Sequence, residues 1–352
     1  MRNYVLRRLG QAVLVLWAAY TLSYLLLSAL PGDAVTNRAQ NPDAQLSPEA
    51  AQQLLEYYGM DRPLWEQYLS SLAALLRGDL GFSLTNGTPV SELVAAALPS
   101  TLALTGLALV IGLALAAILG IAINYAPWGW LRGIAASIPV LFGSVPTFVV
   151  GILALQFLSF GLHLIPSTDD GSFTALFAPA ATLGILISAS LAQVLAKAIA
   201  KVRALPFVHV LHARGATERY IFGRGVVRNS SLPVLTLLGL ACGELIAGSV
   251  VTESVYARPG LGMLTVNAVS TQDLPVLQGV VLVAALAYVS VNLLVDLAYP
   301  FIDPRILVEG GKRRVPQLGA RKTPVPAPAP QRETAVVGVP APRELTLEVS
   351  MP

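Results

Sequence analysis

The chain has 352 residues, of which 55% are hydrophobic and only 12% charged, and its formal net charge is +3. A soluble globular protein carries about 25% charged residues, so this composition excludes an ordinary soluble domain and indicates an integral membrane protein. The positive charge does not indicate nucleic-acid binding, because the cations lie at the edges of apolar stretches rather than on one soluble face.

The first apolar stretch, residues 9–30, follows three arginines. It is longer than the roughly 7–15 apolar residues of a cleaved signal peptide, so an uncleaved membrane-spanning helix is expected. A long hydrophilic segment, residues 31–99, comes next and is predicted to form a helical extracytoplasmic insertion. Its short helices are expected at Ser47–Tyr58 and Pro63–Leu76, where serine and proline provide start signals.

Further apolar stretches have the length of about 20 residues that a helix needs to cross a bilayer. Lipid offers the backbone no hydrogen-bond partners, so each stretch is expected to be helical. The sequence therefore predicts an all-α integral membrane protein with six transmembrane helices, at about 9–30, 100–124, 134–160, 175–196, 233–253 and 276–300.

The distribution of lysine and arginine predicts the orientation. If the N-terminus is cytoplasmic, the inside segments hold 19 of the 23 lysines and arginines, and these segments are 1–8, 125–133, 197–232 and 301–352. Cytoplasmic loops carry an excess of such residues, so both termini are expected in the cytoplasm of a multi-pass inner-membrane protein.

A basic loop at 206–233 separates the fourth and fifth spans. Small residues such as Ala213 and Gly215 would let a short helix, expected around Ala213–Arg219, press into a groove on a cytoplasmic partner. Arg214 would then face acidic groups, and Glu218 would cap or pair. The alternative is a solvated basic loop that only sets the orientation.

Two carboxylates lie within or near apolar spans. Glu244 is expected to face a cavity or a partner, because a carboxylate at the bilayer centre is costly. It would meet either the ammonium group of a cargo or a partner subunit, and the sequence leaves both readings open. Asn292 and Asp296 fall on one helix face and are expected to brace a neighbouring helix. Gly239 and Gly243 form a small-x3-small face that permits tight helix packing.

The tail, residues 312–352, is rich in proline and alanine, lacks apolar periodicity and is expected to be disordered. The membrane-embedded part of the chain would then be residues 1–311. The tail is either an inert extension or a regulatory arm.

Motifs of enzymes and cofactor sites are absent from the sequence: there is no phosphate-binding loop, no zinc-binding His-Glu-x-x-His and no nucleophile elbow. His209 and His212 have no carboxylate or thiol close by in sequence and are interpreted as ordinary loop residues. We expect no cofactor, no metal and no catalysis, and hence a transport subunit. The alternatives are an ion-coupled carrier and an intramembrane enzyme.

Short motifs follow one another along the spans. They are Leu30-Pro31-Gly32-Asp33, Gly59-Met60-Asp61-Arg62-Pro63, Gly78-Asp79-Leu80-Gly81-Phe82-Ser83, Leu98-Pro99-Ser100-Thr101-Leu102, Arg228-Asn229, Thr252-Glu253, Pro259-Gly260-Leu261-Gly262, Asn292 with Asp296, and Asp303-Pro304-Arg305. In this order the chain, from Arg2 to about Ile306, resembles the permease subunits of the dipeptide/oligopeptide/nickel group of ABC importers.

The resemblance implies the type I ABC importer permease fold and a heteromeric assembly in the lipid membrane. Its partners would be a second, homologous permease, two ATP-binding ATPase subunits and an extracytoplasmic substrate-binding protein, with no nucleic acid. The loop at 206–233 is similar to the segment that couples to the ATPases, matching at Ala213-Arg214-Gly215 and at Arg228-Asn229 with Pro233, but departing at His209–His212. The cargo would be a dipeptide or oligopeptide, or alternatively nickel or another small solute.

Overall fold

The structure is a computed structural model that describes residues 2–28 and 62–302, together with a few isolated positions between 47 and 57. Within the two long ranges, side chains are described for residues 6–26 and 62–295. The described residues form helices and no sheet, with one isolated bridge between Phe82 and Pro89. The all-α prediction is therefore confirmed. The expected helix at Ser47–Tyr58 lies mostly outside the described residues, and the tail at 312–352 lies wholly outside them.

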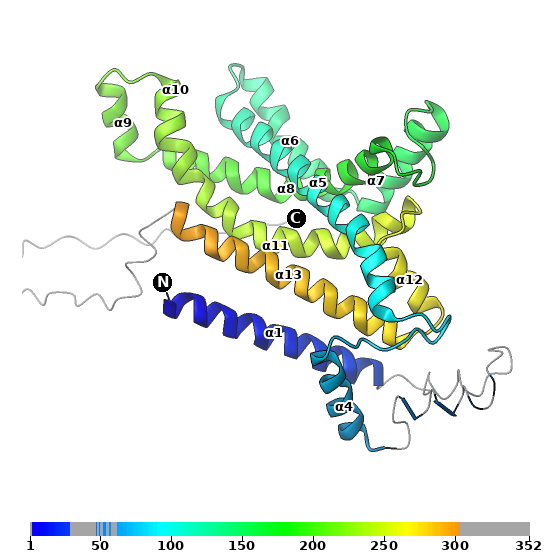
Figure 1. Ribbon diagram of the computed structural model, residues 1–352. Coiled ribbons are helices and arrows are strands. Elements are labelled where there is room, and N and C mark those ends of the chain that lie inside the picture. The colour runs from blue at the N-terminus through cyan, green and yellow to red at the C-terminus, as the bar shows by residue number, and fades with distance from the viewer. Residues whose placement is uncertain are drawn as a thin grey trace, which may run out of the picture. The chain divides into compact units, whose positions relative to one another are not determined.

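The helices follow the chain in a simple order (Figure 1). They are α1 (Arg2–Ser28), α4 (Leu64–Leu76), α5 (Val90–Tyr125), α6 (Gly129–Ser144), α7 (Thr147–Ala154), the π-helical η2 (Leu155–Gly161), α8 (Phe173–Arg203), α9 (Pro206–Ala213), α10 (Glu218–Ile221), the π-helical η3 (Phe222–Val226), α11 (Val227–Val255), α12 (Leu261–Ser270) and α13 (Leu274–Ile302). Of these, α4 matches the short helix predicted at Pro63–Leu76.

Five helical segments of the described chain are long and apolar enough to cross a membrane. They are Leu6–Leu26, Val90–Tyr125, Phe173–Arg203, Glu218–Val255 and Leu274–Val295. Each contains or overlaps a predicted span. The second begins about ten residues earlier than expected, so the first turns of α5 belong to the segment that the sequence assigned to the insertion.

The third predicted span, 134–160, coincides with α6, α7 and η2, which do not form one continuous helix. The helices on either side of Val145 and Pro146 are bent by 98°, which makes this region either a broken span or a re-entrant loop. Proline has no N–H to donate and pushes the preceding residue into extended geometry, and Val145 accordingly has φ −102° and ψ 126°. Pro139 and Pro179, by contrast, lie inside uninterrupted helices.

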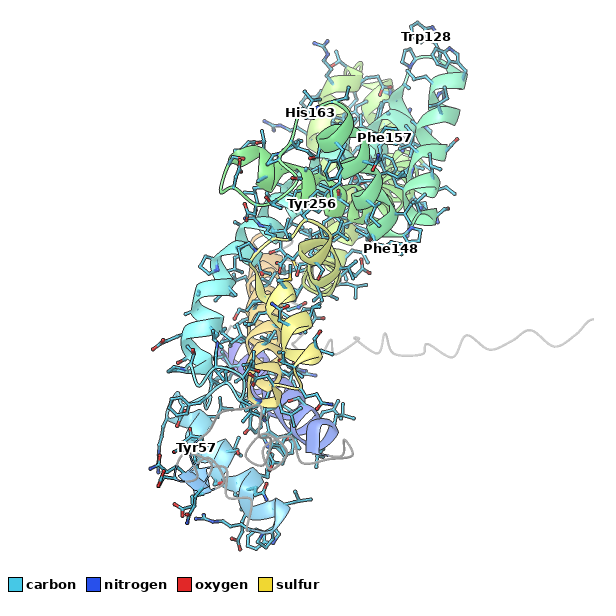
Figure 2. The ribbon with its side chains drawn as sticks, turned by 90° about the vertical axis from the view of Figure 1, so that its right-hand side faces the viewer. Tyr57, Trp128, Phe148, Phe157, His163 and Tyr256 are labelled. Carbon is cyan, nitrogen blue, oxygen red and sulfur yellow. The ribbon has the colours of Figure 1, made fainter. Side chains whose placement is uncertain are left out.

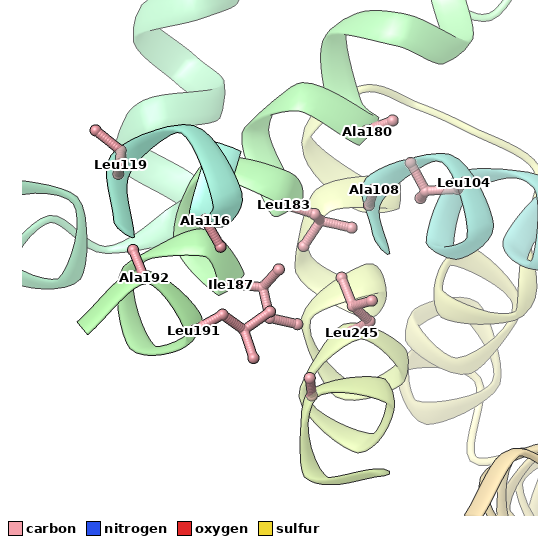
Figure 3. Close-up of a cluster of buried hydrophobic side chains, with 11 residues drawn as sticks. Leu104, Ala108, Ala116, Leu119, Ala180, Leu183, Ile187, Leu191, Ala192 and Leu245 are labelled. Atoms are coloured by element: carbon pink, nitrogen blue, oxygen red, sulfur yellow. The ribbon is translucent and has the colours of Figure 1, made fainter. Parts of the chain in front are cut away.

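The main core lies between α5, α8 and α11 (Figure 3). Its buried apolar side chains are Leu104, Ala108, Ala116, Leu119, Ala180, Leu183, Ile187, Leu191, Ala192, Ala241 and Leu245. The backbones of α5 and α8 approach closely where glycines face each other, because a Cβ on Gly184 would lie 3.0 Å from the carbonyl oxygen of Ala108. These small residues let the two helix backbones approach closely, as is usual within membranes.

Helix α13 packs between α11 and α1, as Figure 1 shows. The predicted small-residue face is confirmed: Gly239 of α11 lies against the Asn292 side chain, and Gly243 lies against the ring of Tyr288. A second core joins the start of α5, α12 and α13, and its buried residues are Val90, Val94, Ala97, Leu261, Ala268, Val276 and Val280. Tyr256, labelled in Figure 2, directly follows α11, and its hydroxyl is hydrogen-bonded to the Thr182 hydroxyl of α8.

Candidate coupling segment, pathway face and buried carboxylates

The candidate coupling segment, residues 206–233, is not a loop. Pro206 begins α9, where its missing N–H costs nothing, and α9 ends at Ala213. The structure does not form the short helix expected around Ala213–Arg219, because α9 ends at Ala213, residues 214–217 form a turn, and α10 begins at Glu218. From Glu218 onward the chain is helical through η3 and α11 as far as Val255, so Arg228, Asn229 and Pro233 lie within a helix.

Gly215 shapes this turn. Its φ of +77° is in the left-handed region that glycine adopts without a steric penalty. The N–H of Gly215 donates to the carbonyl of His212 at 2.9 Å, and the N–H of Ala216 donates to that of Leu211 at 3.1 Å. These two bonds form a Schellman motif, which satisfies the last carbonyls of α9. The glycine is therefore required by the backbone, and not only by close approach of a partner.

His212 and Glu218 hold the two sides of the turn together. Nε2 of His212 lies 2.7 Å from Oε1 of Glu218, and Nδ1 lies 3.0 Å from the carbonyl oxygen of Val208. Both partners can only accept, so the ring satisfies both bonds only as the doubly protonated imidazolium. The hydrogen bond that the ring donates to Glu218 raises the pKa of His212 above its usual 6.5, against the opposing effects of desolvation and of Arg203.

One side of the segment is anchored and the other is open. The buried side chains Ile199, Val202, Val208, Ile221 and Val226 form a small core between α8, α9, α10 and η3. The sequence-predicted coupling residues are on the exposed side, and they are Ala213, Arg214, Gly215, Glu218, Arg228, Asn229 and Pro233. All of them are accessible in the described structure, and Asn229 donates from its Nδ2 to the Gly225 carbonyl at 2.7 Å.

Glu253, at the opposite end of α11, is the functional-site candidate that sequence reasoning missed. It has no solvent exposure. Thr101 of α5 donates to its Oε1 at 2.6 Å, and the N–H groups of Gly262 and Met263 donate to its Oε2 at 2.7 and 3.3 Å. Thr101 also accepts from the N–H of Leu261 at 2.8 Å. The carboxylate thus caps the N-terminus of α12, where the helix dipole favours negative charge.

These contacts bring together three motifs that are far apart in sequence: Leu98–Leu102, Thr252-Glu253 and Pro259–Gly262. Their order along the chain was visible from the sequence, but nothing in that order says that they touch. No local signal predicted the contact, because an N-cap residue directly precedes the first turn of its helix, whereas Glu253 lies eight positions before Leu261.

Two further buried acids connect distant segments near α12. Asp273, 2% exposed, accepts from the Ser83 hydroxyl and from the N–H groups of Leu84 and Thr85 at 3.1 and 3.2 Å. It therefore ties the end of the insertion to the start of α13. Arg258 lies 3.1 Å from Asp169, with side chains only 10% and 11% exposed, and joins the turn after α11 to the loop before α8. Such pairs are costly to break, because one charge would be left buried alone.

The predicted pathway residues are not brought together. Glu244 is on the exposed side of α11, whereas Asn292 packs against Gly239 and donates from Nδ2 to the Tyr288 carbonyl at 2.9 Å. Asp296 lies in α13, and its side chain is outside the described ones. A charged side chain at the bilayer centre costs about 2.5–3.5 kcal/mol on insertion scales, so Glu244 is the member of the set that needs a polar environment.

The sequence matches families of membrane transport components. Residues 108–308 match the family described as binding-protein-dependent transport system inner membrane component, and residues 1–105 match the N-terminal region described for such components. The chain belongs to this family. Membership makes it an ABC transporter permease and implies a binding protein and an ATPase as partners, and it confirms the resemblance inferred from the motifs.

Relatives of this permease align over almost their whole length. The dipeptide transport system permease protein DppB of Lactococcus lactis subsp. cremoris is 31% identical over 307 residues, which cover 87% of this chain and 99% of the relative. The glutathione transport system permease protein GsiC of Salmonella choleraesuis is 33% identical over 307 residues, with the same coverage. The solved MetNI methionine ABC transporter covers 62% of this chain and 96% of its own at 17% identity, but its TM-score of 0.47 is too low to carry an argument.

Proposed function

We propose that this permease is the membrane-spanning subunit of an ATP-driven importer for peptides, which an extracytoplasmic binding protein delivers. The observation that carries the proposal is the full-length similarity to permeases named for dipeptide and glutathione transport. In this assembly the chain catalyses no reaction itself, and the ATPase subunits hydrolyse ATP. A second, homologous permease completes the pathway within the lipid membrane.

The ATPase contacts the turn between α9 and α10. The exposed side chains there support this role: Ala213, Arg214, Gly215 and Glu218 at the turn, and Arg228, Asn229 and Pro233 at the start of α11. Because Glu218 begins a helical segment that ends at Val255, a displacement of the turn moves the far end of α11 as well. That far end holds Glu253 and thereby α12, so the same helix connects the ATPase contact with the opposite end of the pathway.

The orientation follows the positive-inside rule. Both termini and the coupling segment face the cytoplasm of the cell that carries this inner-membrane protein. The insertion, residues 31–99, faces outward and docks the binding protein. Residues 1–311 form the permease domain, and residues 312–352, which lie outside the described residues, are a tail that does not belong to it. The pathway residues are Glu244, Asn292 and Asp296.

Reconstitution of the complete assembly tests the function. Proteoliposomes that contain both permeases, the ATPases and the binding protein should take up a radiolabelled dipeptide only with ATP, and nickel or free amino acids should not compete. Uptake driven by a proton or sodium gradient without the ATPases would identify a secondary carrier instead. ATP-dependent uptake of nickel alone would keep the machinery and replace the cargo.

A further inference from the structure

The exposed stripe of α11 is distinct from its two packed faces. Gly239 and Gly243 face α13, and Ala241 and Leu245 enter the core with α5 and α8. What remains is a row of exposed residues spaced three or four apart, consisting of Thr236, Leu240, Glu244, Ala247 and Val251. No helix of the described chain covers this row.

Glu244 lies next to the midpoint of the fifth span that the sequence predicts, 233–253. A helix of that length is about 30 Å long, which matches the thickness of the hydrocarbon core, so the predicted span places Glu244 near the middle of the membrane. Glu244 makes no hydrogen bond or ion pair within the described part of the chain, and α11 carries no cation beyond Arg228. A carboxylate at this depth faces a protein partner or a water-filled cavity rather than lipid. The single acidic group therefore assigns the stripe to a partner or a water-filled cavity rather than to lipid.

We propose that Glu244 receives the positively charged amino terminus of the cargo and so selects peptides with a free amine. This inference rests on the proposed function and names the substrate chemistry of its pathway. The neighbours along the stripe, Leu240 and Val251, are apolar, so the carboxylate is the group of this face that distinguishes an ammonium from a neutral amide. Charge-assisted hydrogen bonds of this kind are among the strong ones that a protein makes.

The first measurement asks what faces position 244. In the complete assembly, with Cys242 replaced by alanine, Glu244→Cys should react with a membrane-impermeant methanethiosulfonate, and a transported dipeptide should slow that reaction. A cysteine that no reagent reaches in any nucleotide state would place Glu244 against the partner permease, and the inference would be wrong. This measurement does not depend on the identity of the natural cargo.

The second measurement asks what the charge selects. Uptake of alanyl-alanine and of its N-acetylated form is measured in Glu244→Gln, and each rate is divided by the wild-type rate for the same cargo, so that the preference of the binding protein cancels. We expect the free-amine ratio to fall about tenfold relative to the acetylated ratio, in line with loss of one hydrogen bond to a charged group. Glu244→Asp should restore it, and Asp170→Asn, the same chemical change on an exposed loop, should leave both ratios near one.

Equal ratios for the two peptides in Glu244→Gln would overturn the inference while leaving peptide import intact. If the wild type imports only the free-amine form, uptake of that peptide is compared between Glu244→Gln and Glu244→Asp. Equal uptake by these two variants would count against the inference. A wild-type assembly that imports neither peptide contradicts the proposed function instead, so the two failures are distinguishable.

Discussion

Glu253 is a carboxylate without solvent exposure, and donors from α5 and α12 occupy both of its oxygens. Its effect is positional, because α12 is held to α11 and α5 by this side chain. Nothing in the local sequence distinguishes it from Glu244, which is nine positions earlier in the same helix and exposed. The difference between the two acids depends on which face of α11 each occupies, and that is decided by the packing of other helices.

The first prediction compares these two acids. Glu253→Gln removes the charge and puts an NH2 group where Oε1 accepts from the Thr101 hydroxyl, so a hydrogen bond to a charged group worth about 1.5–3 kcal/mol is lost. The melting temperature of the purified protein in detergent should fall by several degrees. Glu244→Gln is the matched control and should melt close to the wild type. Equal melting temperatures for the two variants would show that Glu253 does not hold α12.

The second prediction concerns pH. The folded pKa of His212 is raised by Glu218, so the stability from this contact is fully present below about pH 6.5 and is lost as pH rises through the raised folded value. After correction for the intrinsic rate, hydrogen exchange of residues 206–221 should therefore become faster at high pH. Glu218→Gln should exchange fast at all values. An unchanged pH profile in this variant would mean that the pair does not stabilise the turn.

At the scale of elements, the turn between α9 and α10 has the shape that Gly215 permits. The sequence placed this glycine inside a short helix, because small residues were interpreted as a contact surface for a partner. The Schellman bonds instead make it the C-terminal stop of α9. A bulky substitution there would disturb the backbone as well as any partner contact, so a smaller change is the sharper test.

The third prediction uses that smaller change. Gly215→Ala forces a residue with a Cβ into the left-handed region, at a cost of about 1–2 kcal/mol, and should lower ATP-driven import several-fold by loosening the turn. Gly223→Ala, in helical η3 with open space around it, is the control and should import normally. ATP hydrolysis by the assembly, measured beside import, shows whether the two processes have become uncoupled. Normal import by Gly215→Ala would mean that the shape of this turn is unimportant.

The elements that the sequence predicted well are those in which composition decides the outcome. Apolar length sufficed for α1, α5, α8, α11 and α13, because a membrane leaves a long apolar stretch little alternative to a helix. It did not suffice around Pro146, since Pro139 and Pro179 are accommodated within helices while Pro146 accompanies a 98° bend. Whether a proline breaks a helix depends on how its neighbours satisfy the freed backbone groups, and this is a tertiary property.

At the scale of the whole molecule, three candidate functional groups lie along one helical segment. Glu218 lies at its start, Glu244 lies eleven residues before its end, and Glu253 lies close to its end. The sequence proposed the coupling residues because charge and small residues gather there. The capping role of Glu253 was not proposed, because it needs Thr101, which is 152 positions away.

The fourth prediction tests the orientation of the molecule. In a protein with Cys242 replaced by alanine, Gly129→Cys at the turn between α5 and α6 should react with an impermeant thiol reagent only in inverted vesicles. Thr271→Cys, between α12 and α13, should react only in intact cells. Both positions are exposed in the described structure, so access is limited by the membrane alone. Labelling of Gly129→Cys from outside would reverse the assigned orientation.

The uninterrupted helical segment from Glu218 to Val255 also fixes a rotational phase. One residue corresponds to about 100° of rotation around a helix axis. A single inserted or deleted residue between the coupling turn and Glu253 would therefore turn the capping acid away from α12, even if every contact at the turn survived. Homologous permeases should accordingly vary freely in the length of their loops, but hold the number of residues in this segment constant.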